Sequence, residues 1–302
     1  MSTDENPQVP ARRESREAVR EKAALVQAKQ RRGRIARTSV ISVVVVAIVA
    51  AAGVAVAWSF VSQSSQPELA PAGMQDDGVV VTSVSSAALA AVGADAGASP
   101  APATDSSATT TAPVEVSIYV DYLSSDSADF ETANAKQIAE WVAQGAAHVS
   151  YHPVALLTAK SNGTKYSLRA AAAAACVATH EPAIFVTFNH ELLAQKPAAD
   201  TDGLSDKQLA DIAQAAGATD PQTVRTCIEQ GSFKPWVQDA TTRALSTNVG
   251  TTGSPINGPT VLVNGTPYVG ALDSAKEFAQ FVLTIASDAY FKSATPSPTP
   301  AP

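Results

Sequence analysis

Apolar and polar residues alternate clearly along residues 114–120, which read VEVSIYV. Because successive side chains of a strand point to opposite faces, this alternation predicts a half-buried β-strand. Residues 127–144 place apolar side chains at helical spacing, and residues 148–156 return to a strand pattern. The three segments together predict a β-α-β unit with parallel strands and a right-handed connection.

Helical patterns dominate the next part of the chain, with little strand signal between them. The predicted helices cover residues 166–179, 182–195, 205–216, 221–230 and 235–248. Three of them begin near a proline, which the first turn of a helix tolerates. The chain then predicts a strand at 259–264, an Asn264-Gly265 hairpin turn, a short strand at 267–269 and a final helix at 273–290.

The most apolar stretch is residues 40–60, which read VISVVVVAIVAAAGVAVAWSF and carry no charge. About 20 such residues suffice for a helix to cross a bilayer. Residues 1–38 carry ten Lys and Arg against five acidic residues, whereas the chain beyond the apolar stretch has a net charge of −12. Basic residues stay on the cytoplasmic side, so we predict a cytoplasmic tail at 1–38, a transmembrane helix at 39–61 and an extracytoplasmic remainder.

A cleaved signal peptide is the alternative interpretation of this region. It would have a shorter apolar core, of about 7–15 residues, and a shorter charged lead. The arginine density of the tail could also suggest nucleic acid, but contact with anionic lipid headgroups or a topology signal explains it better. The prediction is therefore a single-pass protein of the cell membrane with no nucleic-acid partner.

The extracytoplasmic part divides by composition. Residues 62–112 form a linker of low complexity, except that 77–84 read DGVVVTSV and predict an outlying strand. Residues 113–292 are long enough for one folded domain with its own core. Residues 293–302 form a proline-rich tail.

Two segments carry a resemblance to a known family. Residues 120–131 read VDYLSSDSADFE and follow the first strand of the β-α-β unit, while residues 258–265 read GPTVLVNG. In this order the motifs resemble the DsbA-type branch of the thioredoxin superfamily, in particular its actinobacterial membrane-anchored members. The resemblance implies an α/β thioredoxin-like fold with an inserted helical subdomain, here preceded by one transmembrane helix.

The resemblance fails at the sulfur atoms of the family's CxxC turn. Carried over by position, Ser124 replaces the attacking cysteine and Ser127 the resolving one, with Ser125 and Asp126 between them. A serine hydroxyl cannot replace a thiolate in disulfide exchange, and Asp126 disfavours a nearby anion. We therefore expect no catalytic residue in this turn, although the resemblance itself implies an oxidoreductase.

The resemblance also implies a peptide-binding groove beside the turn. Pro259 takes the position of the family's cis-proline. The groove residues carried over are Tyr122, Ser124, Gly258, Pro259 and Thr260. An extended peptide can pair with such a groove through backbone hydrogen bonds, which need no thiol.

Only two cysteines are present, Cys176 and Cys227, and both lie in the helical region. In an oxidising compartment two cysteines usually pair, so we expect a structural disulfide, as the family's actinobacterial members often have. A displaced redox pair is the alternative, although it lacks the helix N-terminus that activates thiolates.

The other candidate sites are weaker. His148 and His152 share one face of a strand but stand about 13 Å apart, too far to bind one metal ion. His180 and His190 lack partners at metal spacing and are expected to be solvated or capping residues. Ser124 has no neighbouring base in the sequence and no GxSxG elbow surrounds it, which argues against a hydrolase. We predict neither a metal nor a cofactor.

The sequence therefore favours a membrane-anchored, redox-inactive DsbA-like domain that binds an extracytoplasmic protein or peptide. A thiol-disulfide oxidoreductase or isomerase of the cell envelope is the second hypothesis, because the family has that activity. A structural or regulatory membrane component that acts through its cytoplasmic tail is the third.

Overall fold

The computed structural model describes residues 69–93, 112–251 and 253–293. All described residues belong to one compact unit of the chain. The predicted tail and membrane-spanning segment lie outside the described residues. Within the described ranges, no helix is both long and apolar enough to span a bilayer.

A six-stranded mixed sheet organises the second unit, with the strand order β1-β2-β4-β3-β5-β6. The central pair is parallel, and every other pair is antiparallel. The strands are β1 (Met74–Gln75), β2 (Gly78–Val81), β3 (Val114–Val120), β4 (Ala147–Pro153), β5 (Thr260–Val263) and β6 (Thr266–Pro267). The parallel β3-α3-β4 unit and the β5-β6 hairpin confirm the sequence predictions.

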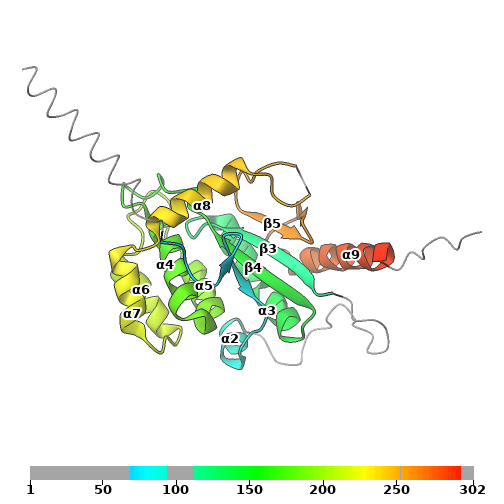
Figure 1. Ribbon diagram of the computed structural model, residues 1–302, viewed down its shortest axis with the longest axis horizontal. Coiled ribbons are helices and arrows are strands. Elements are labelled where there is room, and N and C mark those ends of the chain that lie inside the picture. Colours follow the sequence, from blue (N-terminus) through cyan, green and yellow to red (C-terminus); the bar gives the residue numbers. More distant parts are fainter. Residues whose placement is uncertain (1–68, 94–111, 252, 294–302) are drawn as a thin grey trace, which may run out of the picture. The chain divides into compact units, whose positions relative to one another are not determined.

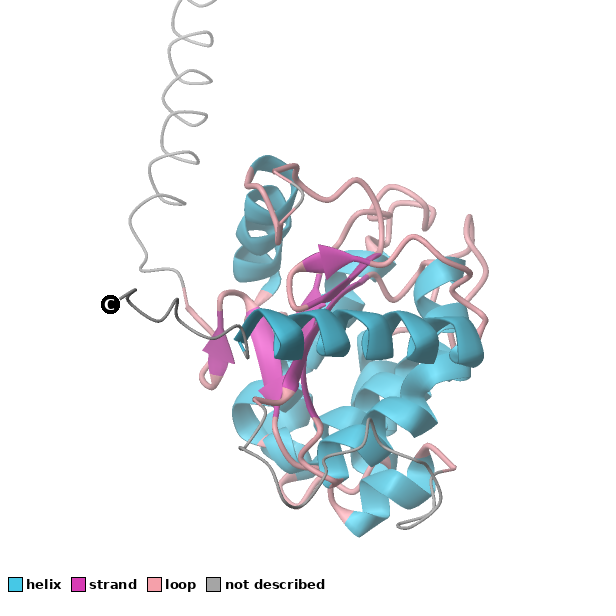
Figure 2. Cartoon of the chain, turned by 90° about the vertical axis from the view of Figure 1, so that its right-hand side faces the viewer, coloured by secondary structure: helices cyan, strands magenta, loops and turns pink. Residues whose placement is uncertain are grey.

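Eight α-helices and one short 3-10 helix accompany the described strands (Figure 1). The helix between the parallel strands is α3 (Ser125–Ala143), and the last is α9 (Ala275–Ser293), which crosses in front of the strands in Figure 2. The others are α2 (Ser86–Ala91), α4 (Tyr166–His180), η1 (Pro182–Ile184), α5 (Phe185–Ala194), α6 (Asp206–Ala215), α7 (Pro221–Gln230) and α8 (Lys234–Ser246).

The alternation of β3 separates two faces of the sheet. Val116, Ile118 and Val120 are buried in the main core, which also contains Phe130 of α3 and Phe278 of α9. The two phenylalanine rings meet edge to face, with centroids 5.0 Å apart. The opposite face carries Ser117 and Tyr119 of β3 and, beside them, Ser150 and His152 of β4.

Several boundaries differ from the sequence prediction. The strand predicted at 77–84 is confirmed as part of the folded domain, but it is shorter and pairs with β1, which the sequence did not predict. Strand β4 ends at Pro153, before Leu156. The helix predicted at 182–195 begins with the separate 3-10 turn η1. Helix α2 was also missed, because six residues carry too little periodicity to identify a helix.

Close packing explains the alanine run Ala170–Ala175 in α4, where every residue is at most 2% exposed. Small side chains let α5, α7 and α8 approach this central helix closely. The run is therefore a packing surface of the core, and α4 is buried on nearly all sides.

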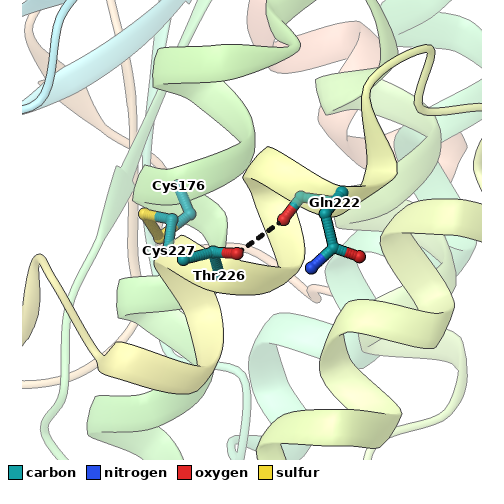
Figure 3. Close-up of a disulfide and its surroundings, with 4 residues drawn as sticks. All are labelled: Cys176, Gln222, Thr226 and Cys227. Carbon is teal, nitrogen blue, oxygen red and sulfur yellow. Dashed lines mark hydrogen bonds between the residues drawn. A yellow bond between two sulfur atoms is a disulfide. The ribbon is translucent and has the colours of Figure 1, made fainter.

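A disulfide joins Cys176 of α4 to Cys227 of α7, as the sequence predicted (Figure 3). The two Cα atoms are 5.9 Å apart, a normal separation for a disulfide. Beside it, the Thr226 hydroxyl donates to the Gln222 carbonyl one turn earlier in α7. The bond ties the inserted helices to the central helix across 51 positions of sequence.

Removing this bond should destabilise the domain. The variant Cys176→Ala/Cys227→Ala is expected to lower the free energy of unfolding by about 4 kcal/mol. Without the disulfide, the unfolded segment between the two positions has more conformational entropy, which stabilises the unfolded state by that amount. Urea denaturation of the full chain measures the change. Reducing the disulfide of the wild type should lower its stability by a similar amount, and the same reductant should not change the stability of the variant. If neither the variant nor the reduced wild type is less stable than the oxidised wild type, the disulfide has no structural role.

Candidate functional site

The turn after β3 places Ser124 and Ser127 at the N-terminus of α3. Ser124 is the N-cap residue of this helix, and its Oγ accepts a hydrogen bond from the Ser127 amide at 3.5 Å. The Ser127 Oγ in turn accepts the amide of Asp121 at 3.1 Å. Both serines are 5% exposed, whereas Ser125 and Asp126 are exposed. The two hydroxyls thus close the turn and cap the helix.

The Asp121 carboxylate is fully buried directly before this turn. It accepts hydrogen bonds from the Leu123 amide at 2.8 Å, the Leu157 amide at 2.8 Å and the Ser167 hydroxyl at 2.7 Å. Burial raises the pKa of Asp121, while these hydrogen bonds act in the opposite direction. One carboxylate therefore holds together the turn, the loop after β4 and the first turn of α4.

Tyr122 does not line the groove, contrary to the prediction from the family resemblance. Its side chain is fully buried, and its hydroxyl donates to Asn189 Oδ1 of α5 at 2.9 Å. Burial also raises the pKa of Tyr122 well above its ordinary value. The residue after Asp121 anchors the turn to the helical region and is unavailable to a ligand.

A second buried carboxylate, Glu131 of α3, faces His190 of α5. The His190 Nδ1 lies 3.3 Å from Glu131 Oε1, and the Glu131 side chain is 4% exposed. The hydrogen bond to Glu131 raises the pKa of His190, against the effect of partial burial. His190 is therefore a partner of α3 and not the solvated or capping residue that the sequence suggested.

The loop before β5 lies beside the turn, as the resemblance implies. Tyr119 pairs with Thr260 in the antiparallel β3-β5 register, which brings Gly258 and Pro259 next to the end of β3. Gly258 and Pro259 of the loop and Thr260 of β5 are each partly exposed. No cis peptide bond occurs among the described residues, so the expectation of a cis-proline at Pro259 is wrong for this structure.

Val269 is an exposed apolar residue near the loop before β5 that the sequence reasoning did not single out. The Tyr268 amide donates to the Val261 carbonyl at 2.8 Å, which extends the β5-β6 pairing and sets Val269 opposite Thr260. Its side chain is 91% exposed, the highest value among the large exposed apolar residues of the described chain. An alternation signal as short as 267–269 could not show which side chain remains uncovered.

The described histidines do not form a metal site. His148 lies 3.0 Å from Glu115 Oε1, while His152 stacks on Tyr119 with ring centroids 4.5 Å apart. Across the three described ranges, no group of three or more His, Cys, Asp or Glu side chains is arranged to bind a metal ion.

The turn at the start of α3, the strand that follows the inserted helices, and the closing helix define a thioredoxin-like domain. Residues 108–283 match the family model described as Thioredoxin, and the chain belongs to this family. Its fold also matches DsbA-type neighbours. No curated protein matches the sequence.

Two solved structures illustrate the similarity. The reduced disulfide bond oxidoreductase DsbG from Mycobacterium tuberculosis is 26% identical, with 73% of this chain and 95% of that chain covered and a TM-score of 0.50. Oxidised DsbA from Mycobacterium tuberculosis is 28% identical, with 65% and 97% covered and a TM-score of 0.48.

The Glu131–His190 pair predicts a pH-dependent contribution to stability. Because the folded-state pKa of His190 is raised, this contribution is fully present below its unfolded pKa, about 6.5, and is lost as the pH rises through the folded value. At pH 5.5, His190→Gln should cost about 1 kcal/mol, and less at pH 8.5. Urea denaturation across this range measures the difference.

The variant Glu131→Gln provides the matched comparison, since it removes the other partner. It should also abolish the part of the pH dependence that comes from His190. If both variants keep the wild-type change in stability between these pH values, the pair does not have this role.

Proposed function

We propose that the chain is a membrane-anchored, extracytoplasmic DsbA-like protein that binds an extended polypeptide segment and does not exchange disulfides. The observation that carries this proposal is the use of Ser124 and Ser127 as helix-capping and turn-closing residues where the family has its reactive sulfurs. The membrane anchor is proposed from the apolar segment 40–60 and its basic flank.

The edge of the loop before β5 supports peptide binding. Strand β6 pairs only with Leu262 and Val263 of β5. The next hydrogen bond runs from the Tyr268 amide to the Val261 carbonyl. Val269 lies opposite Thr260, so only Gly258 and Pro259 extend past the paired segment, and both are partly exposed. An extended chain can add to such an edge through main-chain hydrogen bonds, while an apolar side chain of the ligand packs on Val269.

The second candidate is a thiol-disulfide oxidoreductase that uses Cys176 and Cys227. The similarity to the Mycobacterium tuberculosis oxidoreductase favours it, as does a surface cavity of about 440 Å³ that Cys227 lines. Against it, Cys176 is 0% exposed and Cys227 only 6%, so an attacking thiolate has little access to either sulfur.

Cysteines at positions 124 and 127 should give the chain thiol-disulfide exchange activity. The variant Ser124→Cys/Ser127→Cys is expected to oxidise a dithiol peptide with oxidised glutathione as the terminal oxidant, because the N-terminus of α3 stabilises a thiolate. The wild-type chain should stay at the background rate. Peptide oxidation is followed by fluorescence quenching.

Two controls separate the candidates. Ser127→Cys alone lacks the attacking thiol and should remain inactive. Wild-type activity that disappears in Cys176→Ala/Cys227→Ala would instead assign the reaction to that pair and overturn the proposal.

Charging the groove edge should weaken peptide capture. Val269→Asp is expected to lower the affinity for an unfolded, cysteine-free polypeptide such as β-casein by about tenfold, since loss of one buried apolar contact costs about 1–2 kcal/mol. Leu245→Asp is the matched control, because Leu245 is also an exposed apolar residue but lies on α8. Fluorescence anisotropy gives both affinities; equal losses, or none, would place binding elsewhere.

A further inference from the structure

A separate cavity of about 460 Å³ lies on the polar and aromatic face of the sheet. Its walls come from the turn between β1 and β2, the ends of β3 and β4, helix α8 and the loop that follows α8. Tyr119 and His152 line it, and both project from the face opposite to Val116, Ile118 and Val120. The cavity is therefore distinct from the α3 turn and from the Val269 edge.

The imidazole of His152 forms the floor of this cavity in a tightly fixed position. On one side it stacks on the Tyr119 ring, with centroids 4.5 Å apart and an interplanar angle of 15°. On the other side it covers Gly78, where an added Cβ would lie 2.6 Å from His152 Cε1. A side chain at position 78 would displace the ring, so glycine there permits the arrangement.

One polar atom of this ring has no partner. His152 is 7% exposed, and its Nδ1 is buried without a hydrogen bond. Burial lowers the pKa of His152, although Asp77 and Asp76 act in the opposite direction, so the ring is held toward its neutral form. A neutral imidazole can present Nδ1 as an acceptor, and a buried unpaired acceptor is costly unless a ligand or water supplies a donor.

The charged groups around the cavity do not balance. Arg243 of α8 binds Asp77 through two hydrogen bonds of 2.8 Å, which pairs those two charges. Asp76 also lines the cavity, and its carboxylate has no ion-pair partner among the described residues. The remaining wall is mixed: Val154 and Ala244 are apolar, whereas Thr247 and Asn248 are polar. The cavity thus combines the Asp76 carboxylate, which has no ion-pair partner among the described residues, with aromatic rings and a partly apolar wall.

We propose that this cavity is a binding site for a small organic amine, that is, a ligand with an ammonium group and an apolar body. The ammonium group lies near the Asp76 carboxylate, and the apolar body packs between α8 and the stacked rings of Tyr119 and His152. The assignment does not depend on the peptide-binding proposal, because it uses none of the same residues.

The test uses 2-phenylethylamine as the probe and the isotope-labelled full chain in detergent micelles. The chain has four histidines, so its imidazole carbon–proton resonances are few, and His152→Asn identifies the relevant one. The amine should shift the His152 resonance saturably, with a dissociation constant of roughly 1 mM for a ligand of this size. The neutral analogue 2-phenylethanol should cause a much smaller shift.

Asp76→Asn tests the charge without disturbing the turn. Asp76 has a φ of 48°, a left-handed conformation that asparagine adopts readily. The variant should weaken amine binding by about two- to fivefold, because an ammonium–carboxylate ion pair is lost at an exposed rim of the cavity. Asp239→Asn, on the same helix as Arg243 but exposed and away from the cavity, should have no effect.

The outcomes separate clearly. A saturable His152 shift that Asp76→Asn weakens and Asp239→Asn does not would support the site. Equal shifts with the amine and the alcohol, or equal binding by Asp76→Asn and wild type, would overturn the assignment of an amine. Absence of any His152 shift at tens of millimolar amine would overturn the site itself.

Discussion

The buried Asp121 carboxylate connects the segments on which the candidate site depends. It follows the central strand β3, accepts amides from the turn and from the loop after β4, and accepts the hydroxyl at the start of α4. A buried carboxylate without these donors would be strongly destabilising. One side chain therefore links the thioredoxin-like sheet, the N-terminus of α3 and the inserted helical region.

Ser124 and Ser127 contribute to this arrangement through their hydroxyl groups. Ser124 caps α3, and Ser127 accepts the Asp121 amide, so both hydroxyls satisfy main-chain donors at a helix start. The first turn of this helix also carries the acidic Asp126. In this turn the two hydroxyls contribute to stability by capping the helix and closing the loop.

Local patterns in the sequence predicted much of the fold. The alternation in 114–120, the helical pattern of 127–144 and the Asn264-Gly265 turn each correspond to observed elements, because each depends on interactions between near neighbours. The Cys176–Cys227 bond was also predicted, since the chain offers no other pairing.

The candidate site was less predictable because its contacts join distant segments. The burial of Tyr122 depends on Asn189, and the role of His190 depends on Glu131, which no local pattern reveals. The exposure of Val269 results from where β6 ends, and the stacking of His152 on Tyr119 depends on strand register. A one-residue change in the register of a strand would move its side chains, such as those of Tyr119 and His152, to the other face of the sheet.

The central claim is that the native chain retains a DsbA-like framework without exchanging disulfides. The most direct measurement incubates the full chain with an unfolded protein that carries free thiols, quenches with acid, alkylates under denaturing conditions and determines the intact mass. The account predicts an unmodified mass with the Cys176–Cys227 disulfide closed. A mixed-disulfide adduct, or alkylation of both cysteines, would contradict it.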